Sequence, residues 1–310
     1  MKYLPLVFAI GCTTSAFDPT EFPESVAVEA VTACPAGQWC IESSPATAAA
    51  TLLHSVWAVS AEDLFAVGDD GMILRRTGDV WAQMASPATA NLRGVWAASS
   101  SDAWAGGVGG TILHFDGATW TQVAVPTTAD IDGIWGSGPS DVWFCGSGTV
   151  LHWNGAAFST AGFAGVLLSV SGTGPSDVWA TGENSNLRHW NGTSWTTSNP
   201  ISGTGTFFAV LALSPSDVWV TDFMPGKETG HWNGVKWTSL RTGSGIFNGL
   251  SALAPGDIWG AGGSRVGHWN GTAWTTEQPF GANVALWSVA TPPGHVWIVG
   301  SGGLIAHRSL

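Results

Sequence analysis

Short apolar runs separated by polar turn residues recur along the chain at nearly constant spacing. In the second copy the runs are Gly94–Ala98, Asp102–Gly106, Thr111–Phe115 and Trp120–Val123. They are too short for helices and rich in Val, Ile, Trp and Thr, which is typical of β-strands. The dipeptide Asp116-Gly117 separates the last two runs, and Asn-Gly takes this place in later copies. Such dipeptides adopt the positive φ angles of a tight hairpin turn, so each copy predicts four antiparallel strands.

Two columns of residues align the copies. An acidic residue opens the second run, with His295 in the seventh place; the column is Asp63, Asp102, Asp141, Asp177, Asp217 and Asp257, at steps of 39, 39, 36, 40, 40 and 38 residues. An aromatic residue follows two positions later, as Phe65, Trp104, Trp143, Trp179, Trp219, Trp259 and Trp297. A regular period of this length indicates a repeat architecture. Seven copies of four strands predict an all-β, seven-bladed β-propeller.

The ends of the chain indicate that the repeats close into a ring, whereas an open solenoid is the alternative. The seventh copy stops at Leu310, after its third run, and so lacks a fourth strand. Before the first copy, Pro45 follows Trp39 by the same interval at which Pro87 follows Trp81. We therefore expect an N-terminal strand to complete the last blade. A ring closed in this way has no long unpaired sheet edge.

The amino-acid composition limits which classes of partner the protein can bind. The chain has 310 residues, of which 10% are charged, and its net charge is −12. Its ten Lys and Arg residues are scattered, and phosphate-backbone binding needs clustered cations, so we exclude a nucleic-acid partner. No apolar run approaches the roughly 20 residues of a membrane span. Of the 20 Trp residues, all but Trp287 recur in columns, which favours packing between blades over ligand stacking.

The N-terminal segment suggests export. The first twelve residues, MKYLPLVFAIGC, combine Lys2, an apolar stretch from Leu4 to Ile10, and Gly11-Cys12. This segment resembles the leader of a bacterial lipoprotein, in which cleavage before the cysteine leaves that cysteine lipidated. The resemblance implies a lipid anchor on Cys12 and an outer-membrane or cell-surface location, or otherwise secretion. The alternative is a soluble protein with a frayed apolar start.

Between this leader and the ring, residues 13–35 are acidic and aperiodic and predict a flexible tether, so the propeller spans 36–310. Cys34 and Cys40 bracket a short loop beside the closing strand. An exported protein would form a disulfide there that staples this strand, whereas two free thiols are the alternative. Cys145 takes an aliphatic position of its column and is expected to be a buried hydrophobic residue.

The acidic column invites a catalytic or metal interpretation. A second column, Arg75 followed by His114, His152, His189, His231, His268 and His307, lies on the third strands. Each Asp is expected to pair with the His of its own blade, and Asp63 with Arg75, as a hydrogen-bonded brace. The Asp–His–Trp combination is similar in kind to the structural network of WD-repeat propellers. Metal ligands must converge on one ion, and one His per blade is too dispersed, so we predict no metal and no cofactor.

The repeat resembles two families of propellers. Val95-Trp96, Gly110, Ile112 and Trp120 follow the rhythm of tectonin-type propellers, whose units occur in sugar- and envelope-binding lectins. The BNR (Asp-box) group, found in sialidases and photosystem-assembly factors, is matched only at Ser140-Asp141. These motifs mark a blade and not an activity. A sialidase needs a tyrosine nucleophile, and the single tyrosine, Tyr3, lies in the leader, so that chemistry is excluded.

One column varies in a way that packing does not explain. Two positions before the aliphatic residue of each inner strand it reads His54, Arg93, Asp132, Leu168, Phe208, Asn248 and Trp287. This column is expected at the rim of the central channel, on the face that also carries the fifth-blade insertion Phe223–Thr229. We predict a ligand-binding rim formed by His54, Arg93, Asp132, Phe208, Asn248 and Trp287. The alternative is drift at a solvent-exposed rim.

These observations favour a monomeric, non-catalytic binding or scaffold module of the cell envelope. Its expected ligand is a carbohydrate or an envelope protein, since mixed aromatic, acidic and amide groups on a concave face suit either. Its expected membrane contact is through the lipid anchor alone. The alternative is a carbohydrate-active enzyme, a glycosidase or lyase, with carboxylates at the channel mouth; a pair about 5–10 Å apart would favour it.

Overall fold

The computed structural model describes residues 34–46, 51–198, 205–222, 228–241 and 246–310. Cys34–Leu310 forms one compact unit. The predicted leader, its lipidation residue Cys12 and residues 13–33 of the predicted tether lie outside the described residues. So does most of the fifth-blade insertion.

The described unit is built from antiparallel four-stranded sheets that follow one another along the chain. The first two are β2 (Leu53–Ala58), β3 (Asp63–Gly68), β4 (Ile73–Thr77), β5 (Val80–Gln83), and β6 (Leu92–Ser99), β7 (Asp102–Gly107), β8 (Ile112–Phe115), β9 (Trp120–Gln122). Two more are β16 (Phe207–Ser214), β17 (Asp217–Asp222), β18 (Glu228–Trp232), β19 (Trp237–Arg241), and β20 (Gly249–Ala254), β21 (Asp257–Gly262), β22 (Arg265–Trp269), β23 (Trp274–Glu277). The last is β24 (Leu286–Ala290), β25 (His295–Gly300), β26 (Ile305–Ser309) and β1 (Trp39–Ile41).

The third and fourth blades share continuous strands. Their six-stranded sheet contains β10 (Ile131–Gly138), β11 (Asp141–Trp153), β12 (Phe158–Gly174), β13 (Asp177–Gly182), β14 (Leu187–Trp190) and β15 (Trp195–Ser198). β11 pairs with β10 through residues 141–146 and with β12 through residues 147–153. β12 pairs with β11 up to Val166 and with β13 from Leu167 onward. Since each of these long strands fills two strand positions, the register divides the sheet into two blades of four and gives seven blades in the described unit.

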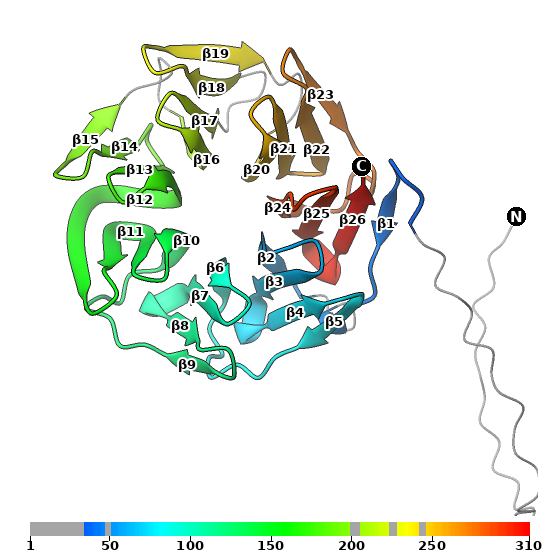
Figure 1. Ribbon diagram of the computed structural model, residues 1–310, viewed down its shortest axis with the longest axis horizontal. Coiled ribbons are helices and arrows are strands. Elements are labelled where there is room, and N and C mark those ends of the chain that lie inside the picture. Colours follow the sequence, from blue (N-terminus) through cyan, green and yellow to red (C-terminus); the bar gives the residue numbers. More distant parts are fainter. Residues whose placement is uncertain (1–33, 47–50, 199–204, 223–227, 242–245) are drawn as a thin grey trace, which may run out of the picture. The chain divides into compact units, whose positions relative to one another are not determined.

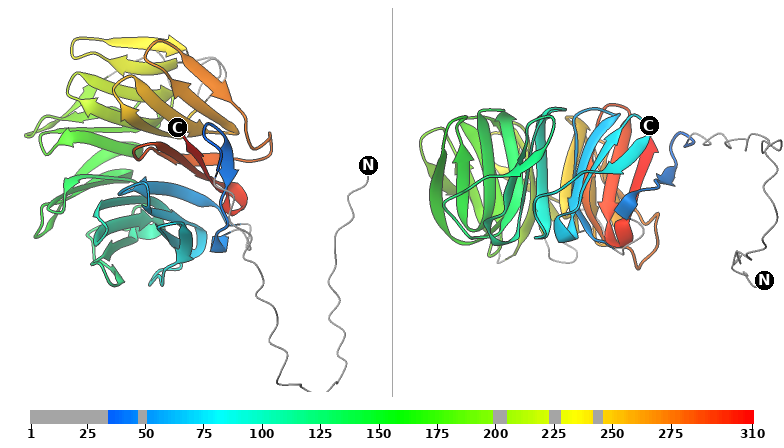
Figure 2. Two further views of the ribbon diagram at one scale, coloured as in Figure 1. Left: turned by 45° about the vertical axis from the view of Figure 1, so that its right-hand side comes forward. Right: turned by 90° about the horizontal axis from the view of Figure 1, so that it is seen from below.

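The blades of this unit are arranged around one axis as a β-propeller (Figure 1). The first strand of each blade is innermost, and the edge-on view in Figure 2 shows the strands running roughly along that axis. In the described residues the structure contains strands and short 3-10 turns. No helix in these parts of the chain is long and apolar enough to cross a membrane.

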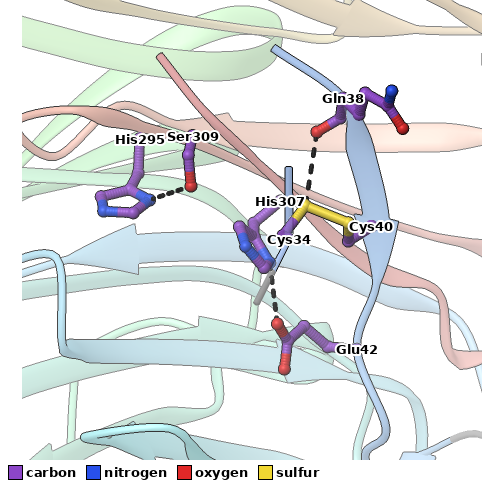
Figure 3. The surroundings of a disulfide bond; sticks show 7 residues. All are labelled: Cys34, Gln38, Cys40, Glu42, His295, His307 and Ser309. Atoms are coloured by element: carbon purple, nitrogen blue, oxygen red, sulfur yellow. Dashed lines mark hydrogen bonds and ion pairs between the residues drawn. A yellow bond between two sulfur atoms is a disulfide. The ribbon is translucent and has the colours of Figure 1, made fainter. Parts of the chain in front are cut away.

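The N-terminal strand completes the last blade, as the sequence predicts. β1 pairs antiparallel with β26, with Trp39 opposite Arg308 and Ile41 opposite Ala306. Just after β1, Glu42 lies 2.7 Å from Nδ1 of His307 (Figure 3). His295 stands where the other blades have Asp, so the closing segment supplies the carboxylate that its own blade lacks. The two ends of the chain thus form one blade.

A disulfide joins Cys34 and Cys40 beside this closure, as the sequence predicts (Figure 3). Both cysteines belong to the N-terminal segment, so the bond does not link β1 covalently to β26. It instead restricts the loop that leads into β1 and brings Gly37 to donate a hydrogen bond to the Ser309 carbonyl at 2.7 Å. Cys145 is free and buried, as expected, and burial raises the pKa of its thiol well above the usual range.

Each blade locks onto the preceding one through a pair of aromatic rings. The ring that begins an outer strand lies 5.5–6.3 Å from the ring on the second strand of the preceding blade. The pairs are Trp81 with Trp297, Trp120 with Phe65, Phe158 with Trp104, Trp195 with Trp143, Trp237 with Trp179, Trp274 with Trp219 and Trp39 with Trp259. The regular use of these rings explains the tryptophan columns as packing between blades.

The first prediction concerns the closing loop. A Cys34→Ser/Cys40→Ser variant should lose about 2 kcal/mol of unfolding free energy, because a bond across a short loop removes little entropy from the unfolded chain. Chemical denaturation followed by tryptophan fluorescence measures this loss. The denaturation midpoint of the wild type in reductant should equal that of the variant, and reductant should not change the midpoint of the variant. An unchanged wild-type midpoint in reductant would contradict this account.

Candidate functional site

The seven inner strands enclose a channel of about 490 Å³ along the propeller axis. Its wall is mostly small or aliphatic, as at Ser55, Val95 and Ser169. The variable column lies at one end of this wall, here called the channel mouth, because each member stands at the start of an inner strand. His54, Arg93, Asp132, Leu168, Asn248 and Trp287 all line the channel. Phe208, on β16, is not among the lining residues, and Ala209 takes that place.

A small-residue column next to the mouth was missed by the sequence reasoning. Directly after the variable residue, the blades carry Ser55, Gly94, Gly133, Ser169, Ala209, Gly249 and Ser288. The inner strands converge at the axis: a Cβ on Gly133 would lie 3.0 Å from Cα of Ser169 on the inner strand of the next blade. The serines bridge blades instead, and Ser55 Oγ accepts a hydrogen bond from the Val95 amide at 3.3 Å. Small residues in every copy were the signal that could have revealed this column.

Two aromatic side chains mark one side of the mouth. Trp287 is 37% exposed, the largest exposed apolar side chain on the channel wall. Its ring packs edge-on against His54, with ring centres 5.7 Å apart. His54 Nε2 lies 2.8 Å from Oδ1 of Asp69, which sits in the turn after β3. Sequence reasoning missed Asp69, although its column also varies from blade to blade, with Val108, Ser147 and Glu183 in the next three copies. The pair holds the imidazole ring against the indole.

An ion-pair cluster marks the other side of the mouth. Arg93 Nη1 lies 2.6 Å from Asp132 and 3.0 Å from Asp130, so one guanidinium nitrogen serves two carboxylates. The side chain of Asp132 is only 10% exposed. Burial raises the pKa of Asp132, helped by the charges of Asp130 and Glu183, and outweighs the opposing effect of Arg93. For Arg93, burial alone would lower the pKa, but its bonds and charge interactions with the two carboxylates raise it, so the guanidinium stays charged.

The remaining members of the column are less charged. Asn248 precedes β20, and its Nδ2 donates a hydrogen bond to the Leu286 carbonyl at 3.0 Å, which ties the sixth blade to the seventh. Leu168 lies within β12 and contributes an apolar contact to the wall. The mouth therefore combines an exposed indole, a held imidazole, an amide and a guanidinium flanked by carboxylates. None of these groups repeats around the ring, which is expected of a recognition surface.

The Asp and His columns lie at the opposite end of the blades, because each Asp follows the turn after an inner strand. Each column histidine from the second blade to the sixth is 2.6–2.9 Å from its Asp, as the sequence predicts. The imidazoles also stack on the blade tryptophans, for example Trp179 on His189 at 3.9 Å. Asp63 binds Arg75 at 2.9 Å in the first blade. The Asp, His and Arg side chains of these columns bind one another within each blade, which confirms the predicted pairing.

Within the described residues, no group of three or more His, Cys, Asp and Glu side chains is placed to hold a metal ion. Asp130 and Asp132 are the paired carboxylates of the mouth, yet both contact the same nitrogen of Arg93. A glycosidase needs the space between its carboxyl groups for the sugar bond or an attacking water. The guanidinium occupies that space, so the geometry argues against this pair as glycosidase machinery.

Comparison with known proteins assigns a fold and no family. No protein-family model matches the chain, and no curated protein matches it. Similar solved structures include YCF48 bound to D1 peptide, with 15% identity, 88% of this chain and 97% of that chain covered, and a TM-score of 0.71. An inactive virginiamycin B lyase from Staphylococcus aureus with quinupristin has 10% identity, 88% and 99% coverage, and a TM-score of 0.76. The WD40 β-propeller domain of Doa1 has 13% identity, 87% and 97% coverage, and a TM-score of 0.68. At these identities, the likeness supports the β-propeller fold alone.

The second prediction tests the brace in the third blade. Asp141 accepts hydrogen bonds from Ser137 at 2.5 Å and Trp143 at 3.0 Å and lies 2.6 Å from His152. Burial alone would raise the pKa of Asp141, but these bonds and the charge of His152 lower it. A depressed carboxyl pKa stabilises the fold above the unfolded pKa, and this contribution disappears as the pH falls through the folded value. Asp141→Asn should therefore cost about 1–3 kcal/mol at neutral pH, and little once the pH is below the folded pKa.

Urea denaturation across a pH series measures this difference. Asp116→Asn is the matched control: Asp116 accepts hydrogen bonds from the Ala118 and Thr119 amides, and asparagine makes the same contacts at Asn154 in the next blade. Bonds from these two amides lower the pKa of Asp116, and asparagine keeps them, so the control should lose much less stability than Asp141→Asn. A stability loss in Asp141→Asn that persists unaltered at acid pH would show that packing, not ionisation, is responsible.

Proposed function

We propose that the chain is a non-catalytic binding module whose channel mouth engages a segment of a protein partner. The observation that carries this proposal is the position of the non-repeated polar side chains and of the exposed indole of Trp287 at one end of the channel. Residues that repeat around the ring build the blades, whereas the mouth differs in every blade. The mouth is concave and mixes apolar and polar groups, which is typical of recognition sites.

The charges of the mouth favour a partner segment with a basic or amide-bearing side chain. Asp69, Asp130 and Asp132 outnumber the single guanidinium of Arg93. The net charge of −12 adds a long-range preference for a basic partner. Trp287 offers its ring face to a cation, and Asp69 adds a carboxylate on the same side of the mouth through its contact with His54. The solved complex of YCF48 with D1 peptide supports a peptide ligand, since it has a similar fold.

A carbohydrate is the second ligand class for the same mouth, because Trp287 offers a stacking surface and Asn248 an amide. The rival function is a lyase. The His54–Asp69 pair at 2.8 Å favours it, since a carboxylate can orient an imidazole as a general base. The virginiamycin B lyase of similar fold supports this rival. In the present geometry His54 packs against Trp287, which suits a binding surface equally well.

Export to the cell envelope is part of the proposal. The resemblance of residues 1–12 to a lipoprotein leader supports it, and so does the Cys34–Cys40 disulfide, since such bonds persist in oxidising compartments. Cys12 would carry the lipid, and the propeller would act as a binding or scaffold module beside the membrane.

The third prediction tests the mouth. In a fluorescence-polarisation screen of random peptides, basic peptides should bind the wild type more tightly than acidic ones, because of the carboxylates. Trp287→Ala should weaken that binding about tenfold, since one indole face in a recognition site contributes about 1–2 kcal/mol. Val235→Ala is the control, because Val235 is 82% exposed and is not among the channel-lining residues.

A glycan array with the same proteins separates the two ligand classes. Binding of glycans alone, lost in Trp287→Ala, would assign the mouth to carbohydrate. If the wild type binds neither peptides nor glycans, the proposed binding function is wrong. If the wild type converts a bound ligand and His54→Gln does not, the protein is a lyase and not a binding module.

The fourth prediction tests the anchor. Cys12→Ser should move the protein from the membrane fraction to the soluble fraction of a bacterial host, because the lipidated atom is removed. Fractionation and mass measurement of the N-terminal peptide report the change. Cys145→Ala is the control thiol. An unmodified Cys12 in an exported wild-type protein would rule out the anchor.

A further inference from the structure

The seven junctions between blades differ at one side-chain position, and the residue there decides whether the space between the two blades is filled. It lies three residues after the aromatic residue of the outer strand and reads Met84, Val123, Ala161, Ser198, Leu240, Glu277 and Glu42. At three junctions this side chain accepts a hydrogen bond from the indole of the next blade. Trp120 donates to Met84 Sδ at 3.4 Å, Trp237 to Ser198 Oγ at 3.1 Å, and Trp39 to Glu277 Oε1 at 2.8 Å.

At the junction of the third and fourth blades this position is Ala161, whose methyl group can neither fill the space nor accept a bond. A cavity of about 360 Å³ lies there, open to solvent on one side. Its lining includes Ala161, Trp143, Trp190, Trp195 and His152. In the described part of the chain, Nε1 of Trp195 has no hydrogen-bond acceptor. Since the 36-residue step between Asp141 and Asp177 is the shortest, the chain here has fewer residues with which to cover the junction.

At the other junctions the aromatic residue of the outer strand has a hydrogen-bond acceptor, needs none, or is buried. Where the filling residue is Val123, the next aromatic is Phe158, which has no donor to satisfy. Where it is Leu240, Trp274 donates to Thr229 Oγ1 at 3.0 Å instead. Trp81 also has no acceptor among the described residues, but its side chain is 5% exposed, so no ligand can reach it. Trp195 is only partly buried and borders the cavity.

The chemistry of the lining selects a ligand class. The three indoles stand at angles to one another, with Trp143 5.6 Å from Trp190 and 5.5 Å from Trp195. The exposed residue Ser159, on the same face of β12 as Ala161, adds a hydroxyl group to the rim. The imidazole of His152 is held by Asp141, so no unpaired cation or carboxylate lines the described cavity. A purely apolar ligand would leave the Trp195 donor without a partner.

We propose that this cavity is a binding site for a neutral hexopyranose unit of a glycan. A pyranose ring has an apolar C–H face that packs on indole and hydroxyl oxygens that accept hydrogen bonds. One hydroxyl takes the place that Met84, Ser198 or Glu277 has at other junctions and accepts the Trp195 Nε1 proton. The Ser159 hydroxyl binds a further oxygen at the rim. This site is separate from the channel mouth and does not depend on its function.

The experiment fills the cavity with the residue that the first blade uses. Ala161→Met places a side chain like Met84 against Trp195, so the fold should be unchanged or more stable. Ala156→Met, on the exposed hairpin turn of the same blade and outside the cavity lining, is the control for added apolar surface. Trp195→Phe keeps a ring but removes the donor, as Phe158 does at the neighbouring junction.

The probes are glucose, galactose, mannose and N-acetylglucosamine, titrated at millimolar concentration into full-length protein with 15N-labelled indoles. At least one hexose should shift one indole N–H resonance in the wild type and in Ala156→Met. That resonance should be missing in Trp195→Phe and should not shift in Ala161→Met, and Trp195→Phe should weaken binding at least fivefold by saturation-transfer NMR.

Three outcomes would overturn the proposal. The first is the absence of any hexose-induced indole shift in folded wild type. The second is hexose binding that persists in Ala161→Met. The third is hexose binding lost in Trp287→Ala but kept in Ala161→Met, which would assign the sugar to the channel mouth. If Ala161→Met does not fold, Trp195→Phe and Ala156→Met decide the matter, and equal affinity in both would reject the site. The first two results leave peptide binding at the mouth untouched, whereas the third would favour carbohydrate as the ligand of the mouth.

Discussion

The fold depends on the contact between aromatic rings of successive blades. A four-stranded sheet leaves both faces apolar, and each face must be buried against a neighbour. The edge-on pairs, such as Trp195 on Trp143 and Trp39 on Trp259, supply this burial at every junction. Each pair contributes about 0.5–1.5 kcal/mol of stability beyond that gained by burying its apolar surface. Because a ring has no terminal blade, the last of these contacts forms only if the N-terminal strand returns to the C-terminal one, as β1 does on β26.

The same constraint divides the molecule into positions that repeat and positions that are free to vary. One end of each blade is fixed by its brace, in which an acidic side chain holds a His or Arg against an aromatic ring, as in Asp177, His189 and Trp179. These polar groups satisfy one another and have little capacity left for a ligand. The other end of each inner strand carries no such brace. Charge, amide and indole groups can differ there from blade to blade without loss of packing, and Arg93, Asn248 and Trp287 do differ.

Departures from the repeat are therefore the most informative features of this chain. Glu42 replaces a missing column Asp by reaching His307 from the other end of the sequence, and this makes closure a part of the brace. Ala161 removes a filling side chain and leaves an indole donor beside a cavity. The solved propellers of similar fold, at 10–15% identity, include YCF48 with D1 peptide, a virginiamycin B lyase with quinupristin and the WD40 domain of Doa1. In this chain the packing of the blades leaves these exceptional positions free to differ from the repeat.

The sequence by itself determined the architecture and the roles of the repeated residues. A period near 39 residues, turn dipeptides and fixed columns predict the strands, the closure through Trp39 and the Asp–His pairs, because each is a local pattern copied many times. The column at the channel mouth was also visible, since its variation departs from the period. The contacts between residues of the mouth could not be predicted from the sequence. Asp69 binds His54, and Asp130 and Asp132 both bind Arg93, through contacts between loops and blades. Nor could spacing place Phe208 outside the lining or reveal the cavity at Ala161, because side-chain direction and unfilled volume are set only when neighbouring blades pack together.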